Sequence, residues 1–145
     1  MAPHYQQSKP GSCLPACARM VLATFRDHLS EQELNTLLKS FDFGTPAFHI
    51  RYLAQIGYNV EYRSFTPHEL ASSLAQGQFP IVILDASMLP WANFEGFHAL
   101  VLLEITDQNV ALHDPAQSEG SNRLLLDGFL AAWREFDDKA AIITQ

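Results

Sequence analysis

The two cysteines of the chain lie four positions apart, in the segment QQSKPGSCLPACARM. The PGS turn signal, with Ser12 as a cap, predicts a helix from about Cys13 to Arg26. Unpaired N–H groups and the helix dipole stabilise an anion at a helix N-terminus, so we expect Cys13 to tend toward the nucleophilic thiolate. Cys17 follows one turn later and is expected to be buried as a small apolar side chain. Burial of Cys13 in the same way remains an alternative.

A nucleophilic cysteine requires a general base and a group that orients this base. His98 opens the apolar run HALVLLEI, and the next such run, VALHDP, closes on Asp114. A hairpin about the turn TDQN would bring His98 and Asp114 together at one end of a sheet. His113 should face the opposite side of its strand. The alternatives are local roles, a histidine at a strand end and an aspartate that begins a turn.

Acyl transfer also needs hydrogen-bond donors for the oxygen of the tetrahedral intermediate. A glutamine amide upstream of the nucleophile can act together with the backbone N–H of the nucleophile. Gln6 and Gln7 both precede Cys13, and the residues alone leave the choice between them open.

Helical patterns dominate the first half of the chain and strand patterns the second. The helices are expected at about Cys13 to Arg26, at about Glu31 to Ser40, in TPAFHIRYLAQIG with Thr45 as cap, Pro46 first and Gly57 as stop, in TPHELASSLAQG capped by Thr66, and in DGFLAAWREF. The strands are expected in YNVEYRSF, PIVILD, FHALVLLEI, VALHDP, RLLL and AAIITQ. This order predicts the α+β class, with a helical half packed on an antiparallel sheet.

Composition limits the function classes. The 145 residues are 48% hydrophobic, which fits a single domain over residues 1–145. A net charge of -7 without a basic run argues against nucleic-acid binding, and no window is apolar enough for a membrane-spanning helix. Two cysteines are too few for a disulfide scaffold, so we expect a cytoplasmic protein.

Several stretches together resemble a known family. The chain is similar to the bacteriocin-processing cysteine peptidases, family 39 of the cysteine peptidases. The likeness rests on Gln7, five further residues, Cys13 and LPACARMVL, followed later by GFHALVLLEITDQNVALHDPA and FLAAWREF. The likeness extends from about Gln7 to Ile143. It implies a papain-like fold and a bacterial protein. The best-known members of the family are domains of peptide-exporting transporters, whereas this sequence shows no transmembrane or nucleotide-binding segment, so we expect a free-standing member.

The resemblance also implies roles for individual residues. Cys13 would be the nucleophile, His98 the base, Asp114 its orienting partner and Gln7 the oxyanion donor, with no cofactor. Leu14 stands where the family usually has glycine.

The expected function is therefore a cysteine hydrolase acting on a peptide or protein substrate. Transfer of the acyl group to an amine, and a catalytically idle peptide-binding domain, are the alternatives. A metal site at the two cysteines fits structural zinc poorly. The aromatic segment MLPWANFEGF either lines a substrate groove beside His98 or covers the core.

Overall fold

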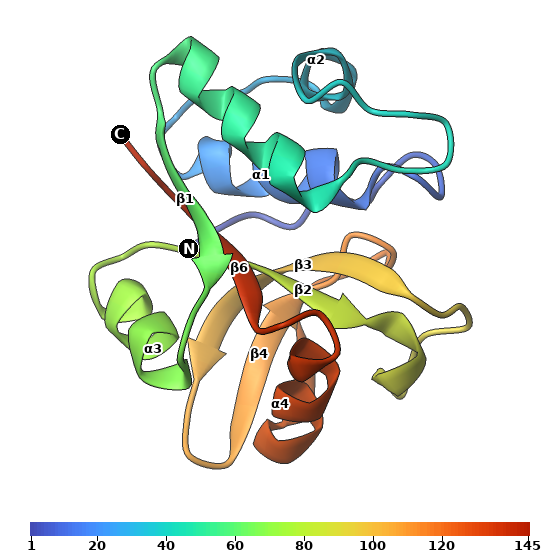
Figure 1. The fold of residues 1–145 in the computed structure, drawn as a ribbon, viewed down its shortest axis with the longest axis vertical. Coiled ribbons are helices and arrows are strands. Elements are labelled where there is room, and N and C mark those ends of the chain that lie inside the picture. The colour runs from blue at the N-terminus through green and yellow to red at the C-terminus, as the bar shows by residue number, and fades with distance from the viewer.

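The computed structural model describes residues 1–145 as helices that cover both faces of one sheet (Figure 1). The helices are α1 (Cys13–Ala23), α2 (Glu31–Leu37), α3 (Pro67–Ala75) and α4 (Leu126–Arg134), with the 3-10 helices η1 (Ala47–Ile56) and η2 (Ala86–Met88). The strands are β1 (Asn59–Ser64), β2 (Ile81–Asp85), β3 (Phe97–Ile105), β4 (Asn109–His113), β5 (Asn122–Leu125) and β6 (Lys139–Thr144). No helix is both long and apolar enough to cross a membrane.

Local sequence signals explain where two of the helices begin. Ser30 and Glu33 form a capping box at α2, since the Ser30 hydroxyl accepts from Glu33 N and the Glu33 carboxylate accepts from Ser30 N. Thr66 and Glu69 do the same at α3. These two predicted starts are confirmed, and so is the stop at Gly57, which has a left-handed φ of 99°.

Other boundary predictions were wrong. Ser12 occupies the position before α1, but its side chain makes no capping hydrogen bond, and α1 ends at Ala23. Thr45 does not cap η1, because its hydroxyl is hydrogen-bonded to that of Ser40, at 2.6 Å. Pro46 precedes the 3-10 helix in an extended conformation rather than opening an α-helix.

The six strands form one antiparallel sheet in the order β1-β6-β2-β3-β4-β5. The α+β class is therefore confirmed. The hairpin of β3 and β4 predicted about TDQN is present, with Val101 opposite His113. β1 comes from the helical half of the sequence but pairs along its whole length with β6, so the last strand ties both halves together.

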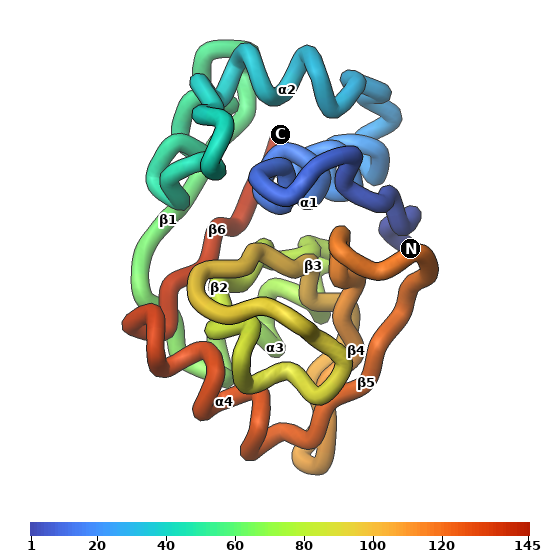
Figure 2. Tube along the Cα trace, turned by 90° about the vertical axis from the view of Figure 1, so that its right-hand side faces the viewer, coloured from blue at the N-terminus to red at the C-terminus, as the bar shows by residue number.

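Alternating residues of the strands feed two hydrophobic clusters on opposite faces of the sheet. One face carries Ile83, Ala99 and Val101, which pack against α1. The other carries Leu84, Leu100 and Leu102, which pack with Phe129 and Trp133 of α4. Figures 1 and 2 show α1 and α2 together beyond one side of the sheet and α4 on the other.

The segment before α1 lies against the loop that follows β4 (Figure 2). Three contacts hold it there. His113 Nε2 is hydrogen-bonded to Ala2 O at 2.8 Å, His4 Nε2 to Asp114 O at 2.8 Å, and Gln7 N donates to Pro115 O at 2.7 Å.

Candidate active site

His98 and Asp114 form a buried pair at the end of the β3–β4 hairpin. Nε2 of His98 lies 2.6 Å from Oδ1 of Asp114, and the two side chains are 2% and 0% exposed. His113, the residue before Asp114, pairs with Val101 of β3, and its ring is bonded to Ala2 O instead of Asp114. The hairpin therefore brings together one histidine and one aspartate at the sheet end.

Asp114 accepts three hydrogen bonds on its two carboxylate oxygens. Besides His98, Ala116 N donates to Oδ1 at 2.8 Å, and Trp91 Nε1 donates to Oδ2 at 2.8 Å. Burial favours the neutral acid and is the largest influence on this group. The hydrogen bonds from His98, Trp91 and Ala116 outweigh it and lower the pKa of Asp114, so the carboxylate is the stable form.

The surroundings of His98 favour the protonated imidazole. Burial, the largest influence, lowers the pKa of His98, but the interactions with Asp114 and Cys13 together raise it to about 9. Because Nε2 is bonded to Asp114, Nδ1 is the ring nitrogen left for Cys13. His98 thus lies between a carboxylate and a thiol, which is the order of groups that a thiol nucleophile requires.

The two cysteines differ in their surroundings. Cys13 is the first residue of α1 and is 6% exposed, whereas Cys17 is 0% exposed. Burial, followed by the charges of Cys13 and Asp114, raises the pKa of Cys17 well above its ordinary value. Cys17 is therefore a protonated, packed thiol. The Leu14 side chain also points into the core, since it is 1% exposed in the cluster beneath α1.

Gln7 is half-buried, whereas Gln6 is exposed. Gln7 Nε2 donates to Lys9 O at 2.8 Å and to Pro10 O at 3.1 Å, which engages both amide hydrogens. Its Oε1 is buried without a partner. The NH₂ group of Gln7 therefore faces the two carbonyl groups of the turn that leads into α1.

The sequence left open whether the aromatic residues of MLPWANFEGF cover the core or lie beside His98, and the structure places Trp91 against the core and Phe94 beside His98. Trp91 packs on one hydrophobic cluster and also donates to Asp114. The Phe94 ring lies edge-on to the His98 ring, with centroids 4.9 Å apart, and is 40% exposed. The only signal in the sequence was the position of these aromatic residues just before His98.

Two further histidines contact backbone carbonyl groups. His4 lies in the segment before α1, and its Nε2 is hydrogen-bonded to Asp114 O. His49 does not face solvent: it is 8% exposed, and its Nδ1 lies 2.7 Å from Leu38 O.

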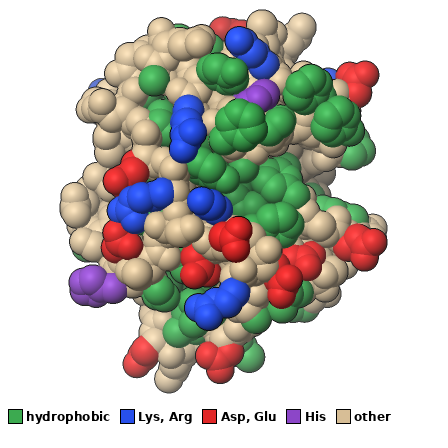
Figure 3. Space-filling model, viewed as in Figure 1, with side chains coloured by type: hydrophobic (Ala, Val, Ile, Leu, Met, Phe, Trp, Pro, Cys, Tyr) green, Lys and Arg blue, Asp and Glu red, His purple; other side chains and the backbone are tan.

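An apolar hollow of about 400 Å³ lies between the helical part and the sheet, where the space-filling view shows clustered hydrophobic side chains (Figure 3). Phe43, Phe48, Tyr62 and Phe97 line it. Phe43 is 84% exposed and Phe48 52%, so this surface is open to solvent. We name it the aromatic hollow.

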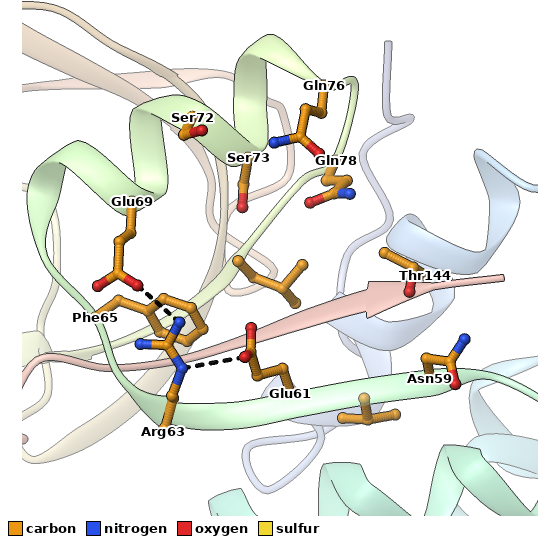
Figure 4. Close-up of a pocket in the computed structure, with 12 residues that line it drawn as sticks. Asn59, Glu61, Arg63, Phe65, Glu69, Ser72, Ser73, Gln76, Gln78 and Thr144 are labelled. Carbon is orange, nitrogen blue, oxygen red and sulfur yellow. Dashed lines mark hydrogen bonds and ion pairs between the residues drawn. The ribbon is translucent and has the colours of Figure 1, made fainter.

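A polar hollow of about 460 Å³ lies between α3 and strands β1 and β6 (Figure 4). Its one cationic group, Arg63, is bonded to Glu69 at 2.7 Å and to Glu61 at 3.2 Å. No cysteine or histidine lines it, so it offers no nucleophile and no general base.

Comparisons with known proteins agree on one family. The sequence model of the peptidase C39 family matches residues 2–137. No curated protein matches the chain.

Three solved structures share the fold at low sequence identity. A C39-like peptidase from Bacillus anthracis is 15% identical, with a TM-score of 0.76 over 99% of this chain and 94% of that one. The peptidase domain of Streptococcus ComA, a bifunctional ABC transporter of a quorum-sensing pathway, is 17% identical, with a TM-score of 0.76 over 99% and 98%. A double-glycine-motif protease from an AMS/PCAT transporter, solved with its leader peptide, is 18% identical, with a TM-score of 0.76 over 99% and 91%.

Proposed function

Because the chain belongs to the peptidase C39 family, we propose that it is a cysteine peptidase that cleaves a peptide bond with Cys13, His98, Asp114 and Gln7. The observation that carries the proposal is the position of His98, which interacts with Cys13 and is bonded through Nε2 to the buried carboxylate of Asp114. Both hydrophobic clusters share one sheet, which supports a single catalytic domain over residues 1–145.

Each group has a defined task in the reaction. The Cys13 sulfur, at the first position of α1 and beside His98, attacks the carbonyl carbon. His98 gives its proton to the leaving amine and later takes one from water, while Asp114 holds the ring in place. Gln7 and the Cys13 N–H stabilise the oxyanion, for which the longer bond from Gln7 to Pro10 O opens. No cofactor is required.

The substrate is a peptide whose apolar side chains occupy the aromatic hollow. Exposed rings at Phe43 and Phe48 offer apolar contact area. Arg51 and Lys139 lie 5.5 Å and 5.8 Å from the Tyr62 ring, which adds a basic rim suited to acidic residues in the peptide. The AMS/PCAT protease, which has the same fold, was solved with a peptide bound. A free thiol nucleophile suits the reducing cytoplasm.

Thiol labelling tests the proposed nucleophile. We expect iodoacetamide at neutral pH to modify Cys13 and to leave Cys17 unmodified, because Cys17 is fully buried and its pKa is raised. Mass spectrometry of tryptic peptides identifies the modified residue. Cys17→Ala should label as fast as the wild type, and His98→Ala more slowly.

The catalytically idle alternative rests on Gln7, both of whose amide hydrogens are engaged by backbone carbonyls. An idle domain has no activated thiolate, so Cys13 would then react at the same slow rate in the wild type and in His98→Ala. That result would support a peptide-binding role in place of hydrolysis.

The pH dependence of activity follows from His98. Its pKa of about 9 means that the imidazolium needed beside the thiolate is present at neutral pH and is lost as the pH rises through about 9. We expect kcat/KM to fall on the alkaline side with an apparent pKa of about 9. Asp114→Asn should move this alkaline limb to lower pH, since the carboxylate helps to raise the pKa of His98. An alkaline limb near 6.5, the ordinary value for histidine, would contradict the assignment.

A further inference from the structure

A third cavity, of about 450 Å³, borders the catalytic groups. It is lined by Gln7, Ser8, Lys9, Pro10, Asn93, Phe94 and Ala116. Building on the peptidase function proposed above, we propose that this cavity binds the leaving-group side of the substrate and selects a large apolar or aromatic residue immediately after the cleaved bond. We name it the leaving-group cavity.

Three of its lining residues are joined directly to the catalytic machinery. Gln7 is the proposed oxyanion donor. Phe94 lies against the His98 ring at 4.9 Å, and the backbone of Ala116 donates to the Asp114 carboxylate. The cavity therefore begins where the reacting carbonyl group must lie, between the oxyanion donor and the imidazole.

The chemistry places the leaving amine at this side. When Cys13 Sγ attacks, the new C–S bond forms, the oxygen turns toward Gln7, and the C–N bond breaks as the His98 proton passes to nitrogen. The leaving nitrogen must lie within hydrogen-bond reach of His98. The residue attached to it therefore extends beside the imidazole, where Phe94 provides a wall.

The aromatic hollow lies elsewhere and suits the other half of the substrate. Its lining residues include Phe43, Phe48 and Tyr62, and they include neither Gln7 nor Phe94. The two cavities share no residue. A peptide that crosses Cys13 can therefore place its acyl part in the aromatic hollow and its amine part in the leaving-group cavity.

The walls of the leaving-group cavity define the preferred side chain. Phe94 remains 40% exposed although it packs on His98, so part of its ring is free for contact with a ligand. Pro10 and Ala116 add further apolar surface. Burying a large apolar side chain here strengthens binding by about tenfold or more over glycine.

The same cavity governs the fate of the acyl-enzyme. Deacylation reverses the first step: neutral His98 takes a proton from the incoming nucleophile, this nucleophile attacks the thioester carbon, and the C–S bond breaks to return the thiolate. An amine with an aromatic side chain can occupy the cavity during this step and compete with water. The cavity thereby sets the balance between hydrolysis and acyl transfer.

Partitioning of the acyl-enzyme provides the test. Short N-acetylated peptide methyl esters acylate Cys13 with a leaving group too small to use the cavity. Phenylalaninamide or glycinamide is then added at equal concentration, and mass spectrometry gives the ratio of amide to acid product. We expect phenylalaninamide to give a ratio at least about tenfold higher than glycinamide. Because the ratio is taken from one acyl-enzyme, a general loss of activity does not change it.

Two matched variants assign the effect to its cavity. Phe94→Ala should reduce the preference for phenylalaninamide to less than about threefold, because the aromatic wall is lost. Phe48→Ala makes the same change in the aromatic hollow and should keep the preference while weakening acylation.

The outcomes separate this proposal from the function on which it rests. Equal ratios for the two amines in the wild type, or an unchanged preference in Phe94→Ala, would overturn the leaving-group cavity and leave the peptidase intact. Absence of any acyl-enzyme with all the esters would overturn the peptidase function itself.

Discussion

Cys13→Ala is expected to lower kcat for peptide hydrolysis by roughly 10⁴-fold or more, because the residual donors and binding groups cannot replace a covalent nucleophile. The change removes one sulfur atom at the first position of α1, next to His98. Single-turnover assays with a peptide that the wild-type protein cleaves measure the loss. Circular dichroism should show an unchanged fold, since alanine suits this helix.

Cys17→Ala is the matched control for this prediction. It makes the same chemical change one turn further along α1, where the side chain is fully buried. We expect it to cost about 1–2 kcal/mol of stability, through the lost packing, and to leave kcat within about twofold of the wild type. If Cys13→Ala kept activity and Cys17→Ala lost it, the assignment of the nucleophile would be wrong.

Asp114→Asn is expected to lower kcat by about 10²-fold to 10⁴-fold. All three groups that contact the carboxylate are donors: His98, Trp91 and the Ala116 backbone. An amide offers one acceptor oxygen, so its NH₂ group must face one of these donors. With the oxygen toward His98 the NH₂ group meets the Trp91 N–H, and with the reverse orientation the imidazole loses its acceptor. Steady-state kinetics measure the loss.

The Trp91 contact allows a second variant to test this reasoning. Trp91→Phe removes the indole N–H and keeps an aromatic ring against the core. In the double variant, the asparagine can direct its NH₂ group to the vacated side and its oxygen to His98. We expect the double variant to recover about tenfold in kcat relative to Asp114→Asn alone, a coupling that a double-mutant cycle measures. Additive losses would show that Trp91 does not control the orientation of residue 114.

The sequence contains strong local signals for much of this arrangement. The capping boxes at Ser30 and Thr66 mark the starts of α2 and α3, and the apolar runs HALVLLEI and VALHDP on either side of the turn TDQN predict the hairpin that brings His98 to Asp114. These features depend on neighbours within a few residues or across one turn, which is the range over which sequence patterns are informative.

Features that depend on distant contacts could not be predicted. The hydrogen bond from Trp91 to Asp114 joins a loop to the far end of another strand, and the contact from His4 to the Asp114 carbonyl spans 110 positions. The position of His49 within η1 likewise gives no sign of the Leu38 carbonyl that its ring contacts. Tertiary packing overrides local preference at these positions.

The anchoring of the first residues on the loop after β4 has a consequence for how the protein is made. The contacts of Ala2 and His4 with His113 and Asp114 link positions more than 100 residues apart in the chain. Such contacts close late, because the entropy of the intervening chain must be overcome first. During synthesis, Cys13 leaves the ribosome long before His98 and Asp114 do. On the proposed assignment, we expect Cys13 to stay apart from His98 until the sheet has been completed, and the growing nascent chain to lack the proposed peptidase activity.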